Sequence, residues 1–178
     1  MVFKTIVAGH SQTPTHIPND EEFEFVILRK PGGLISHLDC SPLSRVYDIP
    51  ADLIVLFLGG NDIAHYKDDP LALSHKLREV LLDLKDFARE IAFVSIESRE
   101  YQEGNRFGIS TQEYEDARQK VTRNIKRYCR LQSFRYINVN RSIFVDNLSP
   151  DGVHFNSVAN AELIRKIKLL AQHARDRL

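Results

Sequence analysis

A run of six apolar residues at 53–58, Leu-Ile-Val-Leu-Phe-Leu, restricts the fold of this chain more than any other feature. The run ends at Gly59-Gly60 and predicts a strand that is buried along its whole length. Four other runs share its continuous, non-alternating pattern, at residues 3–8, 23–28, 91–96 and 136–139. Because strands of this kind are covered on both faces, the five runs together favour a parallel sheet.

Helical periodicity occurs between and after these predicted strands. Apolar side chains recur at i, i+3 and i+4 in three segments, 73–88, 114–128 and 163–174. A shorter helix is expected after residues 31–33. The alternation predicts an α/β fold, a three-layer α/β/α arrangement with a flavodoxin-like, mostly parallel sheet of about five strands. No repeat, linker or low-complexity tract interrupts the chain, so residues 1–178 are expected to form one domain.

The connection between the first two predicted strands is unusual. It contains Pro14 and Pro18, which oppose a helix, and it is barely long enough for a parallel crossover. An irregular loop is therefore expected there, and this loop carries Ser11 and His16.

The charge and cysteine content excludes several classes of protein. The 24 basic and 24 acidic residues cancel, so no global field attracts a polyanion or an anionic membrane. No apolar run approaches the length of a membrane span, and no signal peptide is recognisable, so a cytoplasmic protein is expected. Cys40 and Cys129 match no metal or redox spacing and are expected to be reduced thiols. The histidines form no metal-ligand pattern, so neither a metal nor another cofactor is expected.

In open α/β sheets, ligands bind beyond the carboxyl ends of the strands. Ser11 follows the first predicted strand and is a candidate nucleophile. His154 is a candidate base, because Asp151 lies three residues earlier, a spacing that lets a carboxylate accept a hydrogen bond from an imidazole. Asn61 follows the most apolar strand, and its amide is a candidate donor to a developing oxyanion, as is the N–H of Gly32 or Gly33.

Taken in order, these segments resemble the four sequence blocks of the SGNH (GDSL-type) hydrolase superfamily. The blocks here are Gly9-x-Ser11, Gly32, Gly59-x-Asn61-Asp62 and Asp151-x-x-His154. The chain length and the lack of a targeting segment are similar to the esterase domains of some LINE-type retrotransposon proteins.

The resemblance implies the SGNH hydrolase fold and a metal-independent serine esterase or acylhydrolase acting on small or lipid-type esters. It implies that Ser11 is the nucleophile, that His154 acts as general base and then acid, and that Asp151 orients His154. The implied oxyanion hole consists of the Ser11 N–H, the Gly32 N–H and the Asn61 amide, with Gly33 as the alternative to Gly32. Asp62 would brace its loop rather than react.

His10 departs from the family pattern, because the superfamily usually has aspartate at this position. That aspartate supports the nucleophile loop without performing chemistry, so a histidine would either replace it as a hydrogen-bonding group or impair the site. A catalytically degenerate binding module therefore remains an alternative.

The binding alternative would use the basic stretch from Arg118 to Arg141, which contains no acidic residue. A solvated helix face and an RNA- or protein-binding strip both fit this pattern. A flavodoxin-like flavin site is a further alternative, but Pro14 lies where the phosphate loop needs an N–H donor. The oligomeric state is not predicted.

The substrate is the least constrained property. The long segment 97–110 is expected to form the lip of the pocket, with Arg99 or Arg106 available to favour an anionic ester. Acetyl esters, lysophospholipids and acyl-thioesters all fit the sequence.

Overall fold

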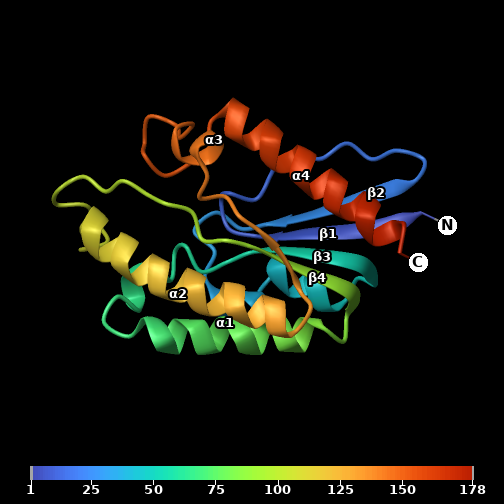
Figure 1. Cartoon of the computed structure of the whole chain (residues 1–178), viewed down its shortest axis with the longest axis horizontal. Helices are drawn as coiled ribbons and strands as arrows, with labels where there is room; N and C mark the ends of the chain where they lie inside the picture. Colours follow the sequence, from blue (N-terminus) through green and yellow to red (C-terminus); the bar gives the residue numbers. More distant parts are fainter. Residues whose placement is uncertain (1, 178) are drawn as a thin grey trace.

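The computed structural model describes residues 2–177 and has a five-stranded sheet at its centre (Figure 1). All neighbouring strands are parallel, in the order β2-β1-β3-β4-β5. The strands are β1 (Phe3–Gly9), β2 (Phe23–Arg29), β3 (Ala51–Phe57), β4 (Ala88–Val94) and β5 (Arg135–Ile137). This order is the flavodoxin-like one and confirms the predicted fold class. Met1 and Leu178, the ends of the predicted single domain, lie outside the described residues.

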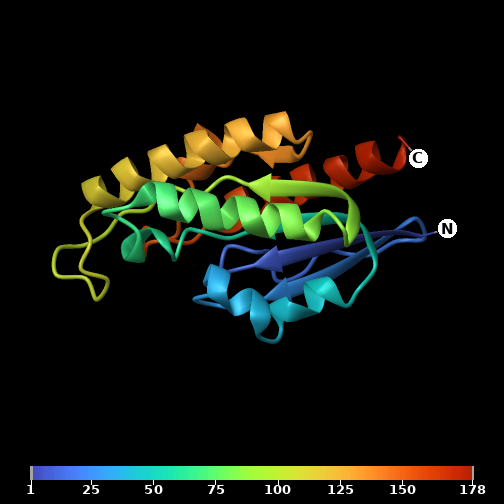
Figure 2. The same ribbon diagram turned by 90° about the horizontal axis from the view of Figure 1, so that it is seen from below.

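Helices cover both faces of the sheet, so the core has two halves. On one face lie α1 (Pro70–Leu84) and α2 (Thr111–Leu131), which are side by side in both views (Figures 1 and 2). On the other face lies α4 (Ser157–Arg175), preceded by the short α3 (Ser142–Val145). In β3, Ile54 and Leu56 pack toward α1 and α2, whereas Leu53 and Val55 pack toward α4. The apolar run at 53–58 is therefore continuous because β3 is covered by helices on both faces, as the sequence predicted.

Three short 3-10 helices complete the structure: η1 (Ile35–Asp39), η2 (Leu43–Tyr47) and η3 (Ile63–His65). The first two occupy the position of the shorter helix expected after residues 31–33. Of the long helices, α2 begins with a capping box in which Ser110 and Glu113 bond to each other's backbone N–H. α1 begins at Pro70, and Asp69 accepts a hydrogen bond from the Ala72 N–H.

The first crossover is an irregular loop, as expected. Side chains of this loop accept hydrogen bonds from the backbone of β2: Asn19 accepts from the Phe25 N–H at 2.7 Å, and Asp20 accepts from the Phe23 N–H at 2.8 Å. Ile17 is buried and fixes the middle of the loop on the α4 side of the core.

The boundary between α1 and β4 differs from the prediction. The apolar period continues through Phe87 and Ala88, but α1 ends at Leu84 and Ala88 begins β4. Phe87 instead packs edge-on against Tyr47, with ring centroids 5.1 Å apart. Phe87 thus matches the helical period in the sequence, but it is apolar because it contacts a distant segment and not because it belongs to α1. The last strand is also shorter than expected and shifted toward the N-terminus.

Cys40 is exposed, Cys129 is buried, and both are free thiols, as predicted. Among the helices of residues 2–177, none combines the length and the apolar character needed to cross a membrane.

Candidate functional site

The carboxyl ends of β1, β2 and β3 meet at one edge of the sheet. Gly9 is paired with Arg29 on one side and with Phe57 on the other, so the loops that follow the three strands start side by side. A Cβ atom on Gly9 would lie 2.0 Å from the Phe57 carbonyl oxygen. Gly9 also has a φ of +152°, which is strained for other residues. Only glycine allows the chain to turn so close to β3, and Ser11 is presented two residues later.

The structure brings Ser11, His154 and Asp151 together across 143 residues of chain. His154 Nε2 lies 3.0 Å from Ser11 Oγ, and His154 Nδ1 lies 2.5 Å from Asp151 Oδ2. A hydroxyl, an imidazole and a carboxylate in this order are the groups of an activated nucleophile, its base and the group that orients the base.

Asp151 is held as a carboxylate by its local contacts. Burial acts to raise its pKa, but hydrogen bonds from the His154 ring and from the backbone N–H groups of His154 and Val153 outweigh it and lower the pKa to about 2. The ionised carboxylate accepts a hydrogen bond from the Nδ1–H group, which leaves the Nε2 lone pair directed at Ser11.

Gln12 holds the His154 loop against the nucleophile loop. Its side chain is only 5% exposed and bonds to the backbone on both sides of His154. Nε2 donates to the Val153 carbonyl, and Oε1 accepts from the Phe155 N–H at 3.1 Å. One amide therefore fixes the backbone on either side of the imidazole.

Asn61 follows β3 and has its amide orientation set by a buried arginine. Arg99 Nη1 donates to Asn61 Oδ1 at 2.9 Å, so the amide nitrogen must point the other way. That nitrogen donates one hydrogen to the Gly33 carbonyl at 3.0 Å and retains a second hydrogen. Arg99 also bonds through Nε and Nη2 to Glu97, which is itself buried.

Gly32 and Gly33 differ in the use of their N–H groups. The Gly33 N–H donates to the Lys30 carbonyl at 2.8 Å, whereas no hydrogen bond within residues 2–177 uses the Gly32 N–H. Gly32 has a φ of +68° and is exposed, while Gly33 is buried against His10. Gly32 is thus the glycine with an available donor.

His10 is 2% exposed and serves as a hydrogen-bonding group in the nucleophile loop. Its Nδ1 accepts from the Gln12 N–H at 3.2 Å, and its Nε2 lies 3.7 Å from Glu97 Oε2. Burial lowers the pKa of His10 to about 4, although Glu97 opposes the shift. Burial also opposes ionisation of Glu97, but Arg99 and His10 outweigh it and hold the pKa of Glu97 below its usual range.

Arg99 does not lie at the lip of a pocket, contrary to expectation. Arg99 is only 3% exposed, and its guanidinium donates hydrogen bonds to Glu97, Asn61 and Tyr101. The sequence shows that Arg99 is charged but does not show its partner. The ion pair with Glu97 forms because Gly60 has no side chain: a Cβ atom there would lie 2.6 Å from Arg99 Nη2. Sequence reasoning missed Gln12 and Glu97, and neither belongs to a recognisable spacing.

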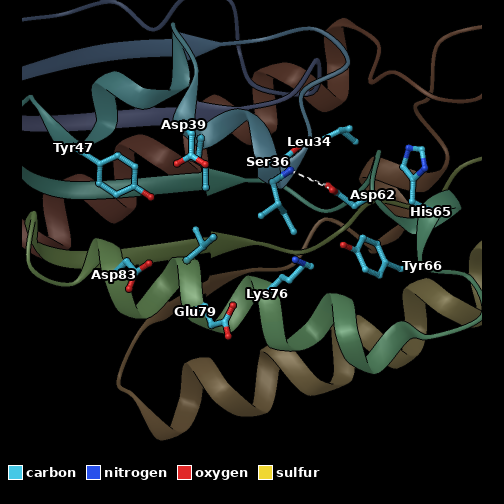
Figure 3. A pocket seen from close by; sticks show the side chains of 13 residues that line it. Leu34, Ser36, Asp39, Tyr47, Asp62, His65, Tyr66, Lys76, Glu79 and Asp83 are labelled. Carbon is cyan, nitrogen blue, oxygen red and sulfur yellow. Dashed lines mark hydrogen bonds between the residues drawn. The ribbon is translucent and has the colours of Figure 1, made fainter.

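Asp62 braces its loop, as expected, by accepting from the Ile35 N–H at 3.2 and 3.3 Å (Figure 3). Burial raises the pKa of Asp62 to about 6, against the effect of this bond. It lines a hollow of about 700 Å³ between η1 and α1, together with His65 (Figure 3). Neither Ser11 nor His154 lines this hollow, so it is distinct from the nucleophile's immediate surroundings.

Within residues 2–177, no three histidine, cysteine or acidic side chains gather in a group able to hold a metal ion. The groups that converge on Ser11 are the His154 imidazole and the Asp151 carboxylate, which are suited to proton transfer.

Comparisons with known proteins agree with this fold. Solved structures with the same fold include an aryl esterase from M. smegmatis, with a TM-score of 0.74, 16% identity, and coverage of 99% of this chain and 100% of that one. A carbohydrate acetylesterase from Sinorhizobium meliloti has a TM-score of 0.70, 13% identity, and coverage of 99% and 100%. An acetylxylan esterase from Geobacillus stearothermophilus has a TM-score of 0.69, 14% identity, and coverage of 92% and 91%. At these identities the likeness shows the fold alone.

No curated protein sequence matches the chain. The model of GDSL-like lipases and acylhydrolases matches residues 41–167, a span that includes Asn61, Asp151 and His154 but not Ser11. The chain therefore belongs to the GDSL-like lipase/acylhydrolase family, a family of carboxylic-ester hydrolases.

Proposed function

We propose that this protein hydrolyses small carboxylic esters with Ser11 as the nucleophile. The observation that carries the proposal is the continuous contact from Ser11 Oγ to His154 Nε2 at 3.0 Å and from His154 Nδ1 to Asp151 at 2.5 Å. The family assignment supports ester hydrolysis independently.

The reaction runs in two halves. Ser11 Oγ attacks the ester carbonyl carbon while His154 Nε2 takes the hydroxyl proton, and the carbonyl π electrons move onto oxygen. The tetrahedral intermediate collapses to an acyl-serine and expels the alkoxide, which receives the proton from His154. Water then attacks the acyl-serine with His154 again as base, and collapse releases the carboxylic acid and restores Ser11.

Three donors would stabilise the oxyanion in both halves. They are the Ser11 N–H, the Gly32 N–H and the second hydrogen of Asn61 Nδ2, with Gly33 as the alternative to Gly32. The role of Asn61 is supported by its fixed orientation, since Arg99 takes its oxygen and the nitrogen is directed elsewhere. Gly32 is favoured over Gly33 because the Gly33 N–H is already bonded to Lys30. Fixed donors of this kind act mainly in the transition state.

Short, uncharged acyl groups are the substrates we favour. The structural relatives named above are described as an aryl esterase, an acetylxylan esterase and a carbohydrate acetylesterase. Arg99 is buried and bound to Glu97 and Asn61, so it is not exposed to select an anionic ester. Longer, lipid-type esters are the alternative substrates, and the test below compares them with short ones.

The test is hydrolysis of p-nitrophenyl esters from acetate to octanoate, with and without EDTA. The expected result is activity that is greatest on short chains, unaffected by chelation and abolished by Ser11→Ala. Ser36→Ala is the matched control, because Ser36 is exposed and lies outside the predicted machinery. Activity that disappears with EDTA and returns with Zn²⁺ would refute the mechanism, as would a folded protein inert toward the whole series.

A further inference from the structure

Positive charge gathers at the sheet edge formed by β5. Three hollows of about 490, 320 and 270 Å³ adjoin this strand, and Tyr136 lines all three. No aspartate or glutamate lines any of them, although the chain has as many acidic as basic residues. The lysines and arginines that line them are Arg118, Arg123, Lys126, Arg127, Arg130, Arg141, Arg165 and Lys166.

The largest of the three hollows combines cations with aromatic rings. Four exposed cations on one face of α2 surround it, and no ion pair within residues 2–177 engages them. By contrast, Arg118 is paired with Glu115 and Arg135 with Glu90. Besides the cations, the hollow is lined by Phe134 and Tyr136, both partly exposed. The four cations are Arg123, Lys126, Arg127 and Arg130, and we call this set, with the two rings, the β5-edge surface.

The helix dipole accounts for only part of this charge. Cations are stabilised in the last turn of a helix, which in α2 contains Arg130. Arg123 and Lys126 lie one to two turns earlier, where the dipole has little effect. Unpaired cations beside partly exposed rings therefore indicate a ligand that supplies both negative charge and flat apolar faces.

We propose that the β5-edge surface binds single-stranded RNA. The four cations span about 10 Å along α2, at 1.5 Å per residue, and can follow several phosphates of a flexible strand. Unstacked bases can stack on Phe134 and Tyr136, while arginines contact phosphates or the base faces.

The neighbouring hollow favours RNA over DNA. It is lined by Gln119 and Asn138, whose side-chain amide nitrogens make no hydrogen bond within residues 2–177. Such groups can bond to a ribose 2′-hydroxyl, which DNA lacks. An acidic protein segment would match the cations but would have no specific use for the two rings.

The experiment measures fluorescence anisotropy of a labelled 15-nucleotide single-stranded RNA with the full chain. DNA of the same sequence, the RNA duplex and poly-glutamate are parallel ligands. Contact with four phosphates predicts that affinity falls roughly fiftyfold between 50 and 200 mM salt. The single-stranded RNA should bind more tightly than each of the parallel ligands.

Two double variants separate this surface from a general charge effect, and a third variant tests the aromatic ring of Phe134. Arg123→Glu/Arg127→Glu should weaken binding at least tenfold, whereas Arg45→Glu/Lys85→Glu, the same charge change at exposed cations elsewhere, should weaken it much less. Phe134→Ala should weaken RNA binding roughly fivefold or more and leave poly-glutamate binding unchanged. Thermal melts by circular dichroism confirm that each variant is folded.

Several results would overturn the proposal. These are the absence of RNA binding by the parent at 50 mM salt, equal losses in the two double variants, and poly-glutamate binding as tight as RNA binding. DNA bound as tightly as RNA would overturn the assignment to RNA.

Discussion

His10 and Asp62 should give the stability of this protein two opposing pH dependences. Both side chains are almost fully buried, at 2% and 4% exposure, so solvent does little to screen their shifts. Burial lowers the pKa of His10 from 6.5 to about 4 and raises that of Asp62 from 3.8 to about 6.

The signs follow from proton binding. Between about pH 4 and 6.5 the unfolded chain protonates His10 and the folded protein does not, so this residue makes the free energy of unfolding rise with pH. In nearly the same window the folded protein keeps a proton on Asp62 that the unfolded chain has lost, so this residue makes the free energy of unfolding fall. At 1.36 kcal/mol per pKa unit, each effect amounts to about 3 kcal/mol, and in the parent protein they largely cancel.

The assay is urea unfolding followed by circular dichroism at about pH 4 and pH 7. We compare the pH 7 minus pH 4 difference in unfolding free energy between variants, since other groups contribute equally. His10→Asn keeps an acceptor for the Gln12 N–H and should lower this difference by about 3 kcal/mol. Asp62→Asn should raise it by a similar amount. If both variants keep the parent's pH dependence, or if the signs are reversed, the burial argument is wrong.

Three further substitutions test the proposed catalytic groups through the kinetics of a short ester. Asp151→Asn should keep the fold and lower kcat by up to about 10⁴-fold, because the orienting carboxylate of His154 is lost; its pKa of about 2 predicts that Asp151 causes no change in rate above about pH 4. Asn61→Ala should lower kcat roughly a hundred- to a thousandfold with little change in KM; a change in KM alone would indicate ground-state binding instead. Gln12→Ala should lower kcat by about ten- to a hundredfold while KM stays near the parent value, and unchanged kcat would show that His154 is positioned without Gln12.

Much of the fold was readable from the sequence because it depends on local patterns. Continuous apolar runs such as 53–58 identify strands covered on both faces, and the structure confirms the parallel sheet and its helical layers. The end of α1 was misplaced because Phe87 continues the helical period but packs against Tyr47, a contact that no local pattern encodes.

The candidate site was readable in part for a similar reason. Asp151 and His154 are three residues apart, and Asn61 sits at a recognisable turn. Gln12, by contrast, acts on residues 141 and 143 positions away, and nothing in its local sequence indicates this.

The buried charges also show what a sequence pattern lacks. From the sequence alone, Arg99 is interpreted as a cation that faces the substrate. In the structure it pairs with Glu97, and this pairing is possible because Gly60 has no side chain. Likewise, His10 departs from the family's usual residue, yet its Nδ1 still accepts a backbone hydrogen bond in the nucleophile loop.

The central claim is that His154 and the oxyanion donors activate Ser11, and labelling with a fluorophosphonate tests it most directly. The reagent phosphonylates a serine only when a base removes its proton and donors stabilise the adduct. The account predicts one phosphonyl group per chain, mapped by peptide mass spectrometry to Ser11, and no label in folded Ser11→Ala or His154→Ala protein. Label on a different residue, or no label on the folded parent protein, would contradict it.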